Sequence, residues 1–75
     1  MINKVLISTE YIKLDSFLKL SGVSQTGGEA KLLIKSGKAL VNHQPCLMRG
    51  KKLRPGDQVK VGEETFEVTA KPAGV

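Results

Sequence analysis

The chain has 75 residues, of which 40% are hydrophobic and 25% are charged, and its net charge is +5. This length predicts one domain over residues 1–75 with a small core, which has little room for an elaborate catalytic pocket. No apolar run is long enough for a membrane helix, and the N-terminus lacks the features of a signal peptide. The lone Cys46 cannot form an internal disulfide. We therefore expect a cytoplasmic protein without a membrane association.

The first half of the chain predicts a strand followed by two helices. Residues 2–8 are rich in apolar and β-branched side chains, which favour a strand. Apolar residues at helical spacing predict a helix over 14–21, with Gly22 placed to end it. The same spacing predicts a second helix over 27–36, with Gly37 as its stop.

The start of the second helix carries the spacing of a capping box. Thr26 precedes Glu29 by three residues, so the Thr26 hydroxyl is expected to accept from the Glu29 amide while the Glu29 carboxylate reaches back to the Thr26 amide. Between them, Gly27 and Gly28 weaken the first turn but leave its backbone N–H groups approachable at the positive end of the helix.

The second half of the chain predicts short strands joined by turns. We expect strands at 39–41, 44–46, 58–61 and 64–69. Asn42-His43 is expected to form a tight turn, residues 48–52 a basic loop, residues 53–57 a turn with Pro and Gly in succession, and residues 71–75 a loose tail. Because helices and strands are grouped rather than alternating, the pattern indicates an α+β fold.

Positive charge is concentrated in the middle of the chain. Seven of the 12 basic residues and none of the 7 acidic ones lie between residues 31 and 54; they are Lys31, Lys35, Lys38, Arg49, Lys51, Lys52 and Arg54. The three lysines follow helical spacing and are expected to share one helix face, which by itself would fit an ordinary solvated surface. Without acidic neighbours, and beside a second basic cluster, the stripe favours a polyanionic partner.

The side chains most often used in catalysis are scarce here. His43 is the single histidine and is interpreted as a turn residue rather than a general base, and Cys46 as a small packed residue. One Cys and one His cannot form a structural zinc site alone, and no nucleotide-binding glycine motif is present. Phe17 and Phe66 fall on apolar faces and are expected in the core, so Tyr11 is the one aromatic residue left for the surface. This argues against an aromatic platform for base stacking. Recognition by shape and phosphate fits better.

Four stretches resemble the S-four RNA-binding domain, named for a small-subunit ribosomal protein. They are Lys13-Leu14-Asp15-Ser16-Phe17-Leu18-Lys19, then Gly22-Val23, then Ala30-Lys31-Leu32-Leu33-Ile34-Lys35-Ser36-Gly37-Lys38-Ala39-Leu40-Val41-Asn42, and Leu53-Arg54-Pro55-Gly56-Asp57-Gln58-Val59-Lys60-Val61. The resemblance covers about residues 11–61. With Thr26-Gly27-Gly28 before Ala30, the chain is similar to the stand-alone bacterial subfamily called YaaA-like or YbcJ-like.

The resemblance implies the alphaL motif, in which two N-terminal helices pack on a small bent antiparallel sheet. It also implies RNA across the second helix and the neighbouring loop. Together with the charge pattern it gives these candidate RNA-binding residues: Lys13, Thr26, Gly27, Gly28, Lys31, Lys35, Lys38, Arg49, Lys51, Lys52 and Arg54.

The sequence departs from the family pattern at two places, the start of the second helix and the Asn42-His43 turn. Many members have an arginine where Gly27 stands, so the Gly27 and Gly28 amides are hypothesised to serve as phosphate donors instead. The usual Asn-Gly turn is here Asn42-His43. In larger members a separate domain performs catalysis, and no such domain is expected in this chain.

The sequence therefore predicts a non-enzymatic, monomeric binder of structured RNA, with ribosomal RNA or a ribosome-assembly intermediate as the partner. No cofactor, metal or small-molecule substrate is expected. The alternative is a protein-interaction adaptor that uses the same basic face against an acidic partner. An RNA-modifying enzyme is the third hypothesis, and it lacks candidate catalytic groups.

Overall fold

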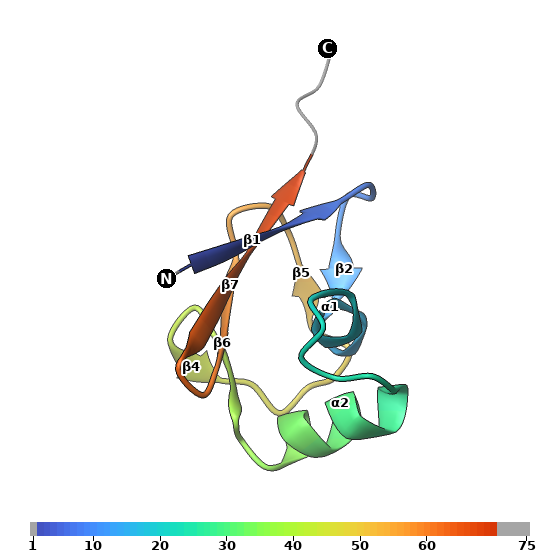
Figure 1. The fold of residues 1–75 in the computed structure, drawn as a ribbon, viewed down its shortest axis with the longest axis vertical. Coiled ribbons are helices and arrows are strands. Elements are labelled where there is room, and N and C mark those ends of the chain that lie inside the picture. The colour runs from blue at the N-terminus through green and yellow to red at the C-terminus, as the bar shows by residue number, and fades with distance from the viewer. Residues whose placement is uncertain (1, 71–75) are drawn as a thin grey trace.

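The computed structural model describes residues 2–70, which form two helices and seven strands (Figure 1). In chain order the elements are β1 (Ile2–Ile7), β2 (Ile12–Lys13), α1 (Leu14–Leu20), α2 (Gly27–Lys35), β3 (Ala39–Val41), β4 (Gln44–Pro45), β5 (Lys52–Leu53), β6 (Gln58–Val61) and β7 (Glu64–Ala70). Helices and strands are segregated along most of the chain, as expected for an α+β fold. The tail predicted for 71–75 lies outside the described residues.

The main sheet has five strands in the order β1-β7-β6-β3-β4, and β2 pairs with β5 in a separate two-stranded ladder. All neighbours pair antiparallel except β1 and β7, which are parallel, from Ile2 opposite Thr65 to Ile7 opposite Ala70. The expectation of a purely antiparallel sheet is therefore wrong. Parallel partners need a long crossover, and here nearly the whole described chain serves as that connection.

The helices are not N-terminal, contrary to what the family resemblance implied. Strands β1 and β2 both precede α1, and the strand expected over 2–8 is confirmed. The first strand, β1, pairs with the edge of β7 along six residue pairs. An uncovered β7 edge would expose unpaired N–H and C=O groups.

Both helices end close to the predicted positions, but Lys38 does not lie on α2. After the C-cap residue Ser36, Gly37 has a φ of 78°, and its amide donates to the Ile34 carbonyl at 3.1 Å. The Lys38 amide then donates to the Leu33 carbonyl at 3.2 Å, which completes a Schellman motif. The left-handed glycine turns the chain off the helix, so helical spacing cannot place Lys38 on the face that carries Lys31 and Lys35.

The capping box is present with one change of partner. The Glu29 amide donates to the Thr26 hydroxyl at 3.1 Å, as predicted. The Glu29 carboxylate, however, accepts from the amide of Gln25 at 3.1 Å rather than from that of Thr26. With Thr26 in an extended conformation, the amide one residue earlier is the one within reach of the carboxylate.

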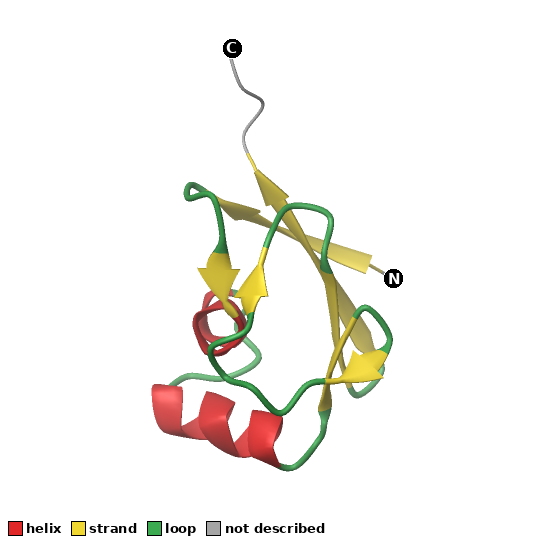
Figure 2. Cartoon of the chain, turned by 180° about the vertical axis from the view of Figure 1, so that it is seen from behind, coloured by secondary structure: helices red, strands yellow, loops and turns green. Residues whose placement is uncertain are grey.

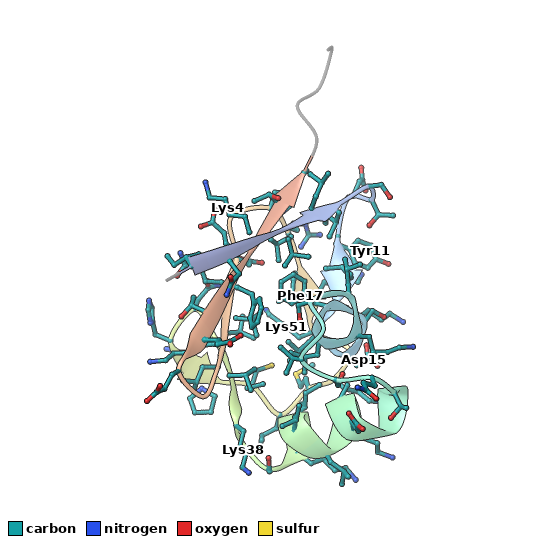
Figure 3. All side chains as sticks on the ribbon, in the orientation of Figure 1. Lys4, Tyr11, Asp15, Phe17, Lys38 and Lys51 are labelled. Atoms are coloured by element: carbon teal, nitrogen blue, oxygen red, sulfur yellow. The ribbon has the colours of Figure 1, made fainter. Side chains whose placement is uncertain are left out.

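The core lies between the helices and one face of the sheet. Figure 3 shows Phe17 between α1 and the sheet, and Phe17 and Phe66 are both buried as predicted. The hydrophobic core takes three residues at helical spacing from α1 and alternate residues from β6 and β7. Its buried members are Ile7, Leu14, Phe17, Leu18, Ala30, Ile34, Ala39, Val41, Leu53, Val59, Phe66 and Val68.

The tight turn at Asn42-His43 is confirmed, with φ values of 49° and 74°. Two left-handed residues are the conformation of a type I′ hairpin turn. The Asn42 side chain explains how the turn is held: its amide nitrogen donates to Asp57 at 3.2 Å, and its oxygen accepts from the Gln58 amide at 3.0 Å. These contacts give His43 the turn position that the sequence predicted.

Candidate nucleic-acid interface

The segment from residue 46 to residue 51, here called the anchored loop, is held by the first turn of α1. The N-cap residue of that helix, Lys13, makes no side-chain cap. Instead the Leu14 amide donates to the Lys51 carbonyl at 2.9 Å, and the Asp15 amide donates to the Arg49 carbonyl at 3.1 Å. These bonds satisfy two helix N–H groups that have no partner within the helix, and they fix the loop that carries Arg49 and Lys51.

The strands β2 and β5 hold the next part of the basic cluster. Ile12 lies opposite Leu53 and Lys13 opposite Lys52 in an antiparallel ladder, which Figure 2 shows beside α1. Leu53 is fully buried and ties this ladder to the core. Lys52 lies in a strand, not in the loop predicted for 48–52, because it pairs with Lys13. Its side chain stays exposed while that of Leu53 is buried.

The ladder places two lysines side by side and brings in an aromatic residue. Like charges on directly opposed residues destabilise a strand pair, so the Lys13–Lys52 arrangement has a cost. The Lys52 ammonium lies 4.9 Å from the centroid of the Tyr11 ring, which is within the range of a cation–π contact. Tyr11 is 36% exposed and lies beside the basic residues, a position that the sequence did not indicate.

The structure leaves every predicted basic site residue exposed. Among residues 2–70, the side-chain hydrogen bonds use none of these charged groups. The eight exposed residues are Lys13, Lys31, Lys35, Lys38, Arg49, Lys51, Lys52 and Arg54. Their charges are therefore available to a ligand.

The eight basic residues fall into two groups by the way the fold holds them. Lys13 and the Arg49–Arg54 stretch are joined through β2, β5 and the start of α1. Lys31 and Lys35 lie on α2, which packs against α1, and Lys38 follows the turn that ends α2. Figure 1 shows that the anchored loop runs at the same end of the molecule as α2.

Comparison with known proteins identifies the family. A family model described as S4 domain matches residues 5–69. The chain belongs to the S4 domain family. It is also 45% identical over 69 residues to the "Probable ribosome maturation protein RlbA" of Bacillus subtilis (strain 168), with 91% of this chain and 97% of that protein covered.

The start of α2 in this S4 domain is open to solvent at both glycines. Gly27, Gly28 and Thr26 are exposed. A Cβ at Gly27 would meet nothing within 4 Å, and one at Gly28 would meet only the Thr26 hydroxyl at 3.8 Å. Neither glycine has a positive φ. Packing and backbone conformation therefore do not require glycine here, and the first-turn amides remain accessible.

Three further features of the described residues concern metal ligands, the cysteine and the helix lengths. Among residues 2–70 no three His, Cys, Asp or Glu residues gather where they could hold a metal ion. Cys46 is half-buried, packs against the core and donates weakly from Sγ to the Met48 carbonyl at 3.7 Å. Neither helix in the described residues is long and apolar enough to cross a membrane.

Proposed function

We propose that this S4 domain binds structured RNA of the ribosome or of a ribosome precursor and performs no catalysis itself. Its basic surface is defined by Lys13, Lys31, Lys35, Lys38, Arg49, Lys51, Lys52 and Arg54, with the Gly27 and Gly28 amides as further phosphate donors. The observation that carries the proposal is the set of eight exposed cations in a chain that belongs to this family. The printed name of the relative, a probable ribosome maturation protein, supports a ribosomal RNA as the partner.

Phosphate binding gives a physical reason for features that cost stability in the free protein. Lys13 and Lys52 repel one another across the β2–β5 ladder, and a phosphate between them would remove that repulsion. Two glycines in the first turn of α2 weaken the helix but let a phosphate approach its amides. A structured RNA provides many phosphates at fixed spacing, which suits a rigid domain with charges on several elements.

The experiment compares two double charge reversals with the same net charge. Lys31→Glu with Lys35→Glu reverses two charges on α2, and Lys4→Glu with Lys60→Glu reverses the charges of two exposed lysines on β1 and β6. Figure 3 shows Lys4 at the end of the molecule opposite Lys38. Affinity for a structured ribosomal RNA fragment should fall about 30- to 100-fold in the first variant and only a few-fold in the second. The salt slope, meaning the slope of log affinity against log salt concentration, should be reduced by about two in the first variant.

The outcomes separate this proposal from its competitors. Equal losses in the two double variants would show that net charge alone drives binding, and no loss in the α2 variant would show that the basic surface is assigned wrongly. Crosslinking in cells should recover RNA with the protein; recovery of protein partners alone would favour an adaptor that binds acidic proteins. Turnover of any RNA by the pure protein would contradict the non-catalytic role.

A further inference from the structure

Two large apolar side chains are exposed immediately before the basic residues of the anchored loop. Leu47 is 63% and Met48 is 68% exposed, and Arg49 follows them directly. They are not required by the core, to which only their neighbour Cys46 contributes from this segment. Adjacent exposed apolar side chains beside a binding surface are a common mark of a contact site.

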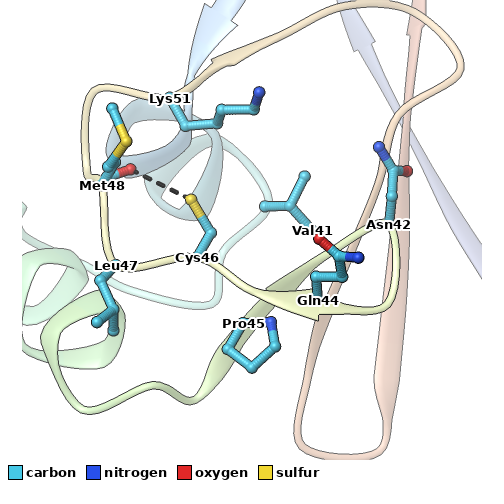
Figure 4. Close-up of a pocket in the computed structure, with 8 residues that line it drawn as sticks. All are labelled: Val41, Asn42, Gln44, Pro45, Cys46, Leu47, Met48 and Lys51. Carbon is cyan, nitrogen blue, oxygen red and sulfur yellow. Dashed lines mark hydrogen bonds between the residues drawn. The ribbon is translucent and has the colours of Figure 1, made fainter.

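These side chains form part of a cleft between the β3–β4 hairpin and the anchored loop (Figure 4). Its volume is about 510 Å³, within the range of small-molecule sites. In Figure 4 the Lys51 ammonium lies on one side of the cleft and the Gln44 amide on the other, with Cys46 and Met48 forming an end wall. The lining residues are Val41, Asn42, Gln44, Pro45, Cys46, Leu47, Met48 and Lys51.

Hydrogen bonds of the backbone and of the Asn42 side chain hold both walls of the cleft in place. The hairpin is fixed by the Asn42 contacts described above, and the Cys46 amide donates to the Ala39 carbonyl at 3.0 Å. The anchored loop is fixed by the α1 amides and by a bond from the Lys51 amide to the Met48 carbonyl at 3.1 Å. Because the cleft is preformed, little conformational entropy is lost when a ligand binds.

The lining combines three kinds of group that together match a nucleotide. Pro45, Leu47 and Met48 offer exposed apolar surface for the face of a flat ring. Gln44 offers one amide donor and one amide acceptor, which suits the edge of a base, whereas the Asn42 amide is already bonded to Asp57 and Gln58. Lys51 supplies a cation for the phosphate next to that base.

We propose that this cleft receives one unpaired nucleobase of the RNA that the basic surface binds. Gln44 hydrogen-bonds the base edge, and Lys51 contacts the adjacent phosphate. The base must be unpaired, because the bases of an A-form helix are not accessible to a cleft of this kind, whereas bulges and loops can present theirs. This inference rests on the proposed function and specifies it: the RNA is a helix with a bulged or looped nucleotide rather than a continuous duplex.

Cys46 offers a direct test in the unmodified protein. It is the single cysteine of the chain and lines the cleft. The rate of its alkylation by a small maleimide is measured with a stem-loop RNA carrying a one-nucleotide bulge and with the same RNA fully paired in the stem, each at saturation. Because a base that fills the cleft would cover the Cys46 thiol, the bulged RNA should slow alkylation relative to the paired RNA. Equal rates with the two RNAs would overturn the inference.

Substitutions in the cleft provide the second arm of the test. The double variant Gln44→Ala with Met48→Ala should lower the affinity ratio of bulged to paired RNA by about five- to tenfold, the scale of burying one ring, and leave affinity for paired RNA unchanged. Leu32→Ala is the matched control, since Leu32 is 69% exposed on α2 and lies outside the cleft; its ratio should equal that of the wild type. All three side chains are exposed, so the fold should tolerate the changes, which a thermal melt verifies.

The results distinguish a failure of the cleft from a failure of RNA binding. If the wild type binds both RNAs equally while the α2 charge reversals still abolish binding, the cleft assignment is wrong and the proposed function stands. If neither RNA binds, the proposed function fails first. Protection of Cys46 by an acidic apolar peptide, and not by bulged RNA, would also overturn the inference and assign the cleft to a protein ligand.

Discussion

The two halves of the proposed basic surface are built in different ways. The α2 half depends on a helix with its own cap and stop: Thr26 closes the first turn, and the Schellman motif at Gly37 closes the last. The other half depends on contacts between distant segments, because the anchored loop and β5 are held by α1 and β2. Charges on α2 therefore follow from local sequence, whereas those at Arg49–Arg54 are positioned by the tertiary structure.

This difference teaches which changes should disturb each half. A change that loosens the junction of β2, β5 and α1 should displace the anchored loop and leave the α2 helix formed. A change at the α2 cap should fray the helix start and leave the loop in place. Because Leu53 and Leu14 join the junction to the core, the loop half is also the one more closely tied to global stability.

The largest effect is expected from Leu53→Ala. Leu53 is fully buried, so its truncation should lower the free energy of unfolding by about 2–5 kcal/mol through lost burial and an unfilled cavity. Urea denaturation measures the loss, and faster hydrogen exchange of the Leu14 and Asp15 amides would show that the loop is released. Leu32→Ala, at an exposed site, should change stability by less than about 0.5 kcal/mol. A loss below about 1 kcal/mol for Leu53→Ala would show that the ladder is not part of the core.

A smaller effect, confined to the other half, is expected from Thr26→Ala. Removing the hydroxyl that accepts from the Glu29 amide should cost about 1 kcal/mol of unfolding free energy. Thr26→Ser keeps the acceptor and should stay within a few tenths of a kcal/mol of the wild type. Amide exchange should rise for the first turn of α2 and stay constant for Leu14 and Asp15. Equal increases in both regions would mean that the two halves unfold as one unit.

The features that the sequence predicted are those encoded locally. Apolar spacing and glycine stops placed α1 and α2 to within a residue, and the Asn42-His43 pair predicted its turn. The predicted strands were also found, although the return strand over 44–46 is limited to Gln44–Pro45. Each of these depends on neighbours within a few residues, where periodicity and turn chemistry decide the conformation.

The features that were missed join segments far apart in the chain. The parallel β1–β7 pairing joins the two ends of the described chain, and no local pattern shows which strands pair. The β2–β5 ladder was missed because a two-residue strand is too short to show alternation. One signal was available: the side chain of Lys13, which precedes α1, cannot accept from helix amides, so their acceptors had to come from another segment or from water. That segment is the anchored loop, which also explains why Tyr11 and Lys52 meet.

The smallest effect is expected at the open start of α2. Gly27→Arg introduces a cation at a position where a Cβ meets nothing within 4 Å. If the α2 half binds phosphates, affinity for structured RNA should rise about three- to fivefold, and the salt slope should steepen by about one. Titrations at several salt concentrations measure both quantities.

Measurements of stability distinguish a gain in RNA affinity through a phosphate contact from a gain that comes only from a more stable helix. Arginine has a better helix propensity than glycine, but a cation near the N-terminus opposes the helix dipole, so the unfolding free energy should change by less than about 0.5 kcal/mol. Gly27→Ala supplies the propensity without the charge and should raise stability without steepening the salt slope. If Gly27→Ala increased RNA affinity as much as Gly27→Arg, helix order rather than a phosphate contact would limit binding. If Gly27→Arg lowered affinity, close approach of RNA to the Gly27 backbone would be the feature that the glycine provides.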